Sequence, residues 1–171
     1  MSDPSAVTAS PAFSIREATV DDVEDIARLV RELALYEKAP EAVTATPDHF
    51  REALFPGEAS PAAYAHVAER HGAVVGMAVW FVSFSTWTGR HGLWLEDLFV
   101  DPTQRGFGIG RALLARLAAI CNRARLDQAR VGRARLELPG DRVLPVSGRD
   151  GARRLDDLSG ERCGASRPHD T

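Results

Sequence analysis

A glycine-rich turn between an apolar strand and a helix is the feature that most constrains how this chain can fold. The run Leu93–Val100 has the composition of a buried strand, and Gly106, Gly108 and Gly110 then lead into a helix. Glycines let the backbone approach a phosphate closely, and the first N–H groups of a helix have no partner within it. The pattern favours a pyrophosphate-binding turn, with a tight turn that binds no ligand as the alternative.

Two common nucleotide-binding motifs do not fit this turn. A Rossmann fingerprint would need a third glycine where Arg111 or Leu113 stands, and a P-loop would need Gly-Lys followed by Ser or Thr. A phosphate bound here would therefore be bound in another kind of fold.

Hydrophobic spacing and capping residues predict the remaining elements. A first strand is expected over 13–18, and Thr19 with Asp22 forms a capping box for a helix that ends near Tyr36. Thr46 before Pro47 predicts a second, shorter helix. The later elements are an antiparallel hairpin over 64–69 and 73–85, a strand over 92–100 and a helix over 109–120. This order predicts one α/β domain over residues 13–121.

Composition excludes several classes of protein. The 171 residues include 21 basic and 24 acidic side chains, and the net charge of −3 provides no general field for nucleic acid. No stretch approaches the roughly 20 apolar residues that cross a bilayer. Two cysteines are too few for the disulfide framework of a small secreted domain, and the histidines lack metal-ligand spacing. We therefore expect a cytoplasmic protein without membrane attachment or bound metal, with a disordered leader over residues 1–12.

Several motifs resemble the GNAT superfamily of acetyl-CoA-dependent N-acetyltransferases. The segment Arg105–Gly110 matches the Q/R-x-x-G-x-G/A turn that holds pantetheine and pyrophosphate in that superfamily. The spermidine/spermine (diamine) N-acetyltransferase branch is similar in the segments Ile15–Thr19, Glu32–Glu37, Trp87–Gly89 and Leu95–Val100. The resemblance implies a mixed central sheet flanked by helices, with acetyl-CoA as co-substrate and a small di- or polyamine as acceptor. It also implies a homodimer, which is common in this branch.

The resemblance further implies roles for individual residues. The residues expected beside the thioester are Leu98, Phe99 and Val100, and those expected to hold the pyrophosphate are Arg105, Gly106, Phe107, Gly108, Ile109, Gly110 and Arg111. Glu96 would accept the ammonium proton, directly or through water, because acids inside an apolar run are often functional. The residues expected to face the amine are Tyr36, Glu37, Trp87 and Asp97.

Each of these roles has a simpler alternative. In a regular strand Asp97 points to the opposite face from Glu96, so the two carboxylates are not expected to share one role, and either is ordinarily solvent-exposed. Tyr36 and Glu37 also fit an exposed pair at the end of a helix, and Trp87 also fits plain core packing.

The sequence changes character after Cys121. The segment 122–171 contains 11 arginines but no Phe, Trp, Tyr, Ile, Met or Lys, which is typical of a disordered tail. On this composition the C-terminal part of the fold is expected to be incomplete. The resemblance places a tyrosine after the helix, in an Asn-x-Pro…Phe-Tyr element, to protonate the departing thiolate, whereas this chain has only Tyr36 and Tyr64.

One hypothesis for the tail is a reading frame displaced by one nucleotide near Ile120–Arg123. With free choice of codons, the shifted frame over Arg123–Asp150 can encode ERGWTRLEWAVLDWNSPAIAFYRSLGA, which contains the missing element. Two alternatives stay open: a catalytically inactive acyl-CoA- or polyamine-binding remnant, and an unstable product without function.

Overall fold

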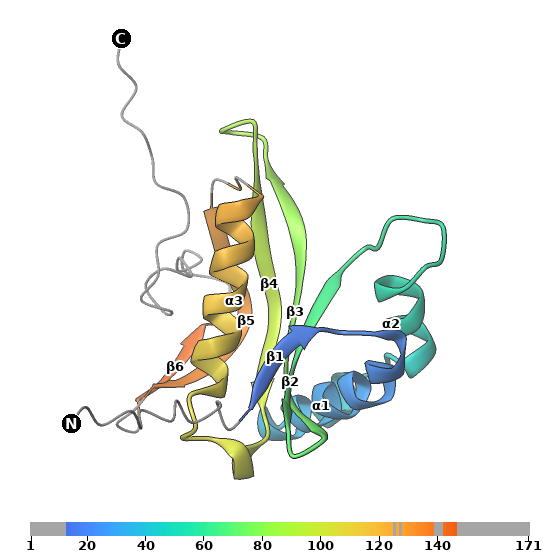
Figure 1. Cartoon of the computed structure of the whole chain (residues 1–171), viewed down its shortest axis with the longest axis vertical. Coiled ribbons are helices and arrows are strands. Elements are labelled where there is room, and N and C mark those ends of the chain that lie inside the picture. Colours follow the sequence, from blue (N-terminus) through green and yellow to red (C-terminus); the bar gives the residue numbers. More distant parts are fainter. Residues whose placement is uncertain (1–12, 125, 127, 139–141, 147–171) are drawn as a thin grey trace, which may run out of the picture.

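A computed structural model describes residues 13–124, 126, 128–138 and 142–146. They form one mixed sheet in the order β1-β2-β3-β4-β5-β6, in which only β4 and β5 pair in parallel. The strands are β1 (Ser14–Glu17), β2 (Tyr64–Arg70), β3 (Ala73–Ser85), β4 (Arg90–Val100), β5 (Gln128–Leu138) and β6 (Arg142–Val146). The helices are α1 (Val23–Tyr36), α2 (Pro47–Leu54) and α3 (Ile109–Arg123), with short 3-10 turns at Val20–Asp22, Pro40–Ala42 and Pro102–Gln104. The expected mixed α/β fold is confirmed (Figure 1).

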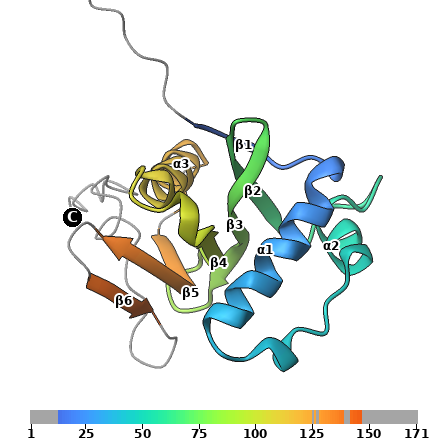
Figure 2. The ribbon, with the colours of Figure 1, turned by 90° about the horizontal axis from the view of Figure 1, so that it is seen from below.

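The sheet is the middle layer of three. Figure 2 shows α1 and α2 on one side of it and α3 on the other. On the first side Ile26 and Leu29 of α1 pack with Met77 and Phe99 of the sheet. On the second side α3 buries its apolar stripe against β3 and β4 through Leu113, Leu114 and Leu117, as its spacing predicts.

The predicted capping box is present at the 3-10 turn that leads into α1, and it carries a partly buried ion pair. The backbone N–H of Thr19 donates to Oδ2 of Asp22 over 2.7 Å, and Arg16 on β1 donates to both carboxylate oxygens over 2.7 and 2.8 Å. These bonds lower the pKa of Asp22 from 3.8 to about 2, because Arg16 and the Thr19 N–H stabilise the charged form against the opposing effect of burial. The cap therefore ties β1 to the entry of α1.

The segment after Cys121 differs from the sequence-based expectation. Helix α3 continues to Arg123, and 128–138 and 142–146 form the strands β5 and β6. Strand pairing uses backbone N–H and C=O groups, so a segment without aromatic residues can still join a sheet. The leader over 1–12 and the tail from 147 on lie outside the described residues.

Candidate functional site

The glycine turn has the backbone shape that the sequence predicts, but its three glycines are not equivalent. Gly106 and Gly108 have φ of +84° and +82°, a region that L-residues rarely adopt, and Gly108 is the N-cap of α3. A Cβ added to either residue would meet no atom within 4 Å, so this side of the turn is open. A Cβ on Gly110 would instead point toward the sheet, 3.8 Å from the side chain of Val100. The open side and the N-terminus of α3 together suit a phosphate group.

Arg105 fixes the turn to the end of β4. Its Nε donates to the carbonyl oxygen of Val100 over 3.2 Å. Its guanidinium carbon lies 4.7 Å from the ring centroid of Tyr36 and 5.9 Å from that of Phe99. Tyr36, which the resemblance assigns to the amine, therefore contacts a residue that the resemblance assigns to the pyrophosphate.

Arg70 also contacts the glycine turn, a role that the sequence analysis missed. Its Nη1 donates to Oε1 of Gln104 over 2.7 Å, and its guanidinium carbon lies 3.6 Å from the ring centroid of Phe107. Arg70 ends β2, and only the register of the sheet brings it to the turn, so no local sequence signal could have found it.

A β-bulge in β4 places Glu96 and Asp97 on the same side of the sheet. Opposite β3, Trp80 pairs with Leu95 and Val79 pairs with Asp97, so Glu96 is the extra residue. Leu95 and Leu98 both pack in the cluster of α3, so Glu96 and Asp97 between them face α1 and α2. The expectation of opposite faces is therefore wrong, because it assumed a regular strand.

Trp94 is a second residue that the sequence analysis missed. Its indole Nε1 donates to Oε2 of Glu96 over 3.0 Å, which orients that carboxylate. The two residues are separated by two positions in β4, so strand periodicity was a usable signal that they share a face.

Near the glycine turn, the backbone of β4 is no longer paired with β5 within the described ladder. The ladder between β4 and β5 ends where Leu98 pairs with Ala134, so Phe99 and Val100 lie beyond that described ladder. These are residues that the resemblance assigns to the thioester, and their main chain continues through Asp101 into the glycine turn.

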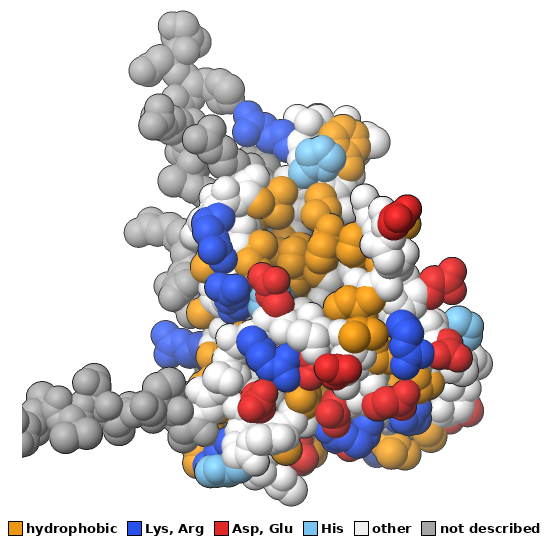
Figure 3. All heavy atoms as spheres, turned by 45° about the vertical axis from the view of Figure 1, so that its right-hand side comes forward, with side chains coloured by type: hydrophobic (Ala, Val, Ile, Leu, Met, Phe, Trp, Pro, Cys, Tyr) orange, Lys and Arg blue, Asp and Glu red, His pale blue; other side chains and the backbone are white. Residues whose placement is uncertain are grey.

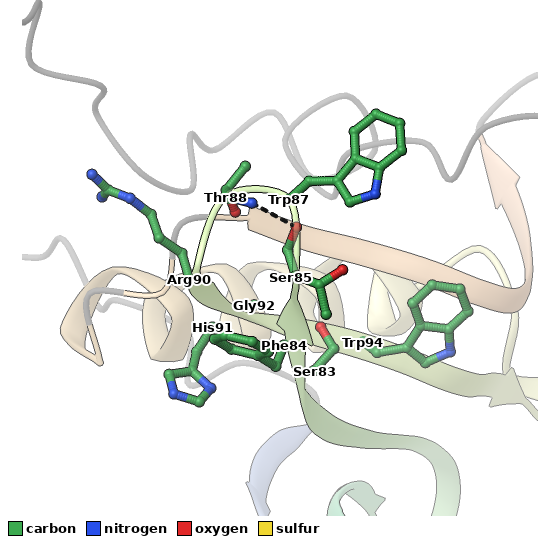
Figure 4. A pocket seen from close by; sticks show the side chains of 10 residues that line it. Ser83, Phe84, Ser85, Trp87, Thr88, Arg90, His91, Gly92 and Trp94 are labelled. Carbon is green, nitrogen blue, oxygen red and sulfur yellow. Dashed lines mark hydrogen bonds between the residues drawn. The ribbon is translucent and has the colours of Figure 1, made fainter.

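Of the remaining predicted residues, Glu37 follows Tyr36 near the turn, whereas Trp87 lies far from it. Glu37 caps the C-terminus of α1 and is exposed. Trp87 is 98% exposed in the β3–β4 connection, which excludes core packing within the described fold. Figure 4 shows its indole projecting from that loop, whose backbone is held by the N–H of Thr88 donating to Oγ of Ser85 over 3.4 Å. The 11 residues of β4 separate Trp87 from the glycine turn by roughly 30 Å, so one chain does not bring Trp87 and Tyr36 together.

The described residues also bear on metal binding and on insertion into a membrane. Among the described residues, no group of three or more His, Cys, Asp or Glu side chains is arranged to hold a metal ion. Within the same part of the chain, no helix is both long and apolar enough to span a bilayer.

Comparison with known proteins agrees with this geometry. The model of the acetyltransferase (GNAT) family matches residues 25–134, which include the glycine turn and both carboxylates of the bulge. The chain belongs to the acetyltransferase (GNAT) family. Thialysine N-epsilon-acetyltransferase from Bos taurus is 38% identical over 125 residues, which cover 66% of this chain and 72% of the bovine protein. The protein of the same name from Sus scrofa is 37% identical, over 62% of this chain and 65% of its own length.

Other similar proteins differ in name and in how much of this chain they match. Human spermidine/spermine N(1)-acetyltransferase-like protein 1 is 34% identical over 66% of this chain, which is 17% of that protein. Among solved structures, the BH1408 protein from Bacillus halodurans superimposes with a TM-score of 0.57 at 27% identity, over 70% of this chain and 81% of that one. A metagenomic aminoglycoside acetyltransferase, with a TM-score of 0.60 at 17% identity over 71% and 77% of the two chains, shows the shared fold alone.

Proposed function

We propose that this protein transfers an acetyl group from acetyl-CoA to a primary amine of a small aliphatic di- or polyamine. The observation that carries the proposal is the glycine turn, whose left-handed Gly106 and Gly108 leave an open face at the N-terminus of α3. The pyrophosphate of acetyl-CoA would bind there, and the thioester would lie along Leu98, Phe99 and Val100. The relatives named for thialysine and for spermidine/spermine support an amine acceptor.

The bulge of β4 supplies the groups that an amine acceptor needs. An alkyl ammonium has a pKa of about 10, so the acceptor must lose a proton before it attacks the thioester. Glu96 lies on this strand with its carboxylate held by Trp94, and it would take that proton directly or through water. Asp97, on the same side of the sheet, adds a second negative charge that favours a cationic substrate.

The proposal is tested with the purified chain, acetyl-CoA and a panel of amines. Spermidine, thialysine, lysine and kanamycin would each be offered, and release of the CoA thiol would be followed continuously. We expect turnover with spermidine or thialysine, and loss of a general base in Glu96→Gln would lower kcat by about 100-fold or more. The matched control is Glu58→Gln, which alters an exposed carboxylate in the loop after α2 and leaves kcat unchanged.

Binding of acetyl-CoA separates the competing outcomes. A thermal shift with acetyl-CoA but no turnover on any amine would mean an acyl-CoA-binding remnant, because a bound ligand raises apparent stability. No thermal shift and no turnover would overturn the proposal. An equal loss of kcat in Glu96→Gln and Glu58→Gln would show that Glu96 is not the general base.

Three sequence-based predictions concern features outside these tests. Cytoplasmic location and a homodimer follow from composition and from the resemblance, and fractionation and light scattering would check them. The displaced reading frame is checked by sequencing the gene across the codons for Ile120–Arg123. Stop codons in the neighbouring frame would end that hypothesis.

A further inference from the structure

A cavity of about 620 Å³ lies at the opposite end of α3 from the glycine turn. Its lining comes from the end of α2, the start of β2, the middle of β3 and the last residues of α3, and includes Leu54, Phe55, Tyr64, His66, Trp80 and Ile120. The 15 residues of α3 separate the two ends by roughly 20 Å, so the cavity is distinct from the site proposed for acetyl transfer. Figure 3 looks onto this side of the molecule, where hydrophobic side chains gather in a hollow with basic side chains along one rim.

His66 in the wall of this cavity has a defined protonation state. Trp80 Nε1–H donates to His66 Nδ1 over 3.2 Å, so Nδ1 carries no proton. Burial lowers the pKa of His66 from 6.5 to about 4, with a further contribution from Arg116, so the ring is neutral near pH 7. The single ring proton therefore sits on Nε2, which makes Nε2 a hydrogen-bond donor.

That donor lacks an acceptor. His66 is 2% exposed, and within the described part of the chain no acceptor lies within hydrogen-bond distance of Nε2. The Nε2 atom itself has almost no exposed surface, so an acceptor oxygen from the cavity reaches it only when the side chains around the ring shift. Because a buried donor that is left unpaired is unfavourable, the hydrogen bond to such an oxygen favours that shift.

The other residues that line the cavity determine which polarity and charge the rest of the ligand must have. Tyr64 and Trp80 stack with ring centroids 4.7 Å apart, and together with Leu54, Phe55 and Ile120 they offer a largely apolar and aromatic surface. Of the charged groups in the lining, Arg123 is basic, and Glu17 is acidic and lies 3.6 Å from Arg116 of α3. The lining thus contains one charge of each sign, which favours a neutral ligand over an ion.

We propose that this cavity binds a small neutral apolar molecule through a carbonyl oxygen that accepts the hydrogen bond from His66 Nε2. The apolar part of the ligand lies against the Tyr64–Trp80 pair. The site is independent of acetyl transfer and takes a different class of ligand from the cationic amine.

Three probes of similar size test this assignment on the full chain. Benzamide offers a neutral carbonyl, toluene offers none, and benzoate offers a charged carboxylate. Binding would be followed by NMR through the indole N–H signal of Trp80, with the indole signal of Trp94 as internal control. We expect benzamide to bind about fivefold more tightly than toluene, which is the effect of one net hydrogen bond, and more tightly than benzoate.

Variants test whether the preference for benzamide over toluene depends on His66. His66→Leu should remove the advantage of benzamide over toluene, and Trp80→Phe should reduce it, because the ring proton would no longer be confined to Nε2. The matched control is His91→Leu, which alters an exposed histidine on β4 and should retain the full advantage.

Three results would overturn the proposal. Equal affinity of benzamide and toluene for the unmodified chain would show that Nε2 makes no bond to the ligand. Tighter binding of benzoate would assign the cavity to anions. A shifted Trp94 signal with an unshifted Trp80 signal would place the binding elsewhere. The comparison of probes on the unmodified chain decides the question even if His66→Leu does not fold.

Discussion

The two kinds of glycine in the turn make a sharp prediction for alanine substitutions. At Gly108, φ of +82° forces alanine into the left-handed region, which costs about 1–2 kcal/mol. Alanine also lowers the entropy of the unfolded chain, and this offsets about 0.4–1 kcal/mol of that cost. Gly108→Ala should therefore lower the free energy of unfolding by about 1 kcal/mol. Gly110 lies in the first turn of α3, where a Cβ meets only ordinary contacts, so Gly110→Ala should stabilise by about 0.4–1 kcal/mol.

The variants Gly108→Ala and Gly110→Ala also distinguish an effect on stability from an effect on acetyl-CoA binding. The methyl group of Gly108→Ala lies on the open side of the turn, where the pyrophosphate would bind. Loss of one hydrogen bond to a charged group is worth about 1.5–3 kcal/mol, so the Kd for acetyl-CoA should rise by about 10- to 100-fold. The methyl group of Gly110→Ala faces the sheet, so this variant should bind acetyl-CoA as the parent does.

Urea unfolding followed by tryptophan fluorescence measures the stabilities, and isothermal titration calorimetry measures the Kd. The reasoning is refuted if Gly110→Ala weakens acetyl-CoA binding as much as Gly108→Ala does. It is also refuted if the two variants have equal stability, since the argument from φ then fails.

Further predictions concern Asp22 in the capping box, Tyr36 beside Arg105, and Gly76 in the sheet. Asp22→Asn should lower the free energy of unfolding by about 1–2 kcal/mol near pH 7, where Asp22 is fully charged beside the partly exposed Arg16. Because the folded pKa of Asp22 is about 2 against an ordinary 3.8, the parent should lose this stability as the pH falls from 4 to 2, and urea titrations should show the variant without that loss. Tyr36→Leu removes the ring beside Arg105; a higher KM for acetyl-CoA alone would show that Tyr36 acts through Arg105, whereas a higher KM for the amine alone would contradict this. Gly76→Ala places a Cβ 3.1 Å from the backbone oxygen of Phe99 and should cost about 1–3 kcal/mol by overpacking, which an unchanged urea midpoint would contradict.

Local patterns predicted the helices and the first four strands because their signals are local. The capping box at Thr19 and the apolar stripe of α3 each depend on residues a few positions apart, and both are present. The bulge at Glu96 was missed although the sequence contained a trace of it. Apolar positions of β4 step from Leu95 to Leu98 by three residues, which a regular strand does not do.

Long-range placement could not be predicted in this way. The contact of Arg70 with the glycine turn and the wide separation of Trp87 from Tyr36 depend on strand register and hairpin length. The pairing of β5 with β4 depends on backbone groups, which composition does not report.

The three tryptophans of the chain occupy three different environments, and this makes them spectroscopic reporters. Trp87 is almost fully exposed, so a polar quencher in solution should reach it first. Trp80 is buried and bonded to His66, so its emission reports ligand entry into the cavity beside it. Trp94 is bonded to Glu96, so its emission reports changes at that carboxylate. In variants that keep one tryptophan each, fluorescence emission would therefore report separately on the β3–β4 hairpin, the cavity and the bulge.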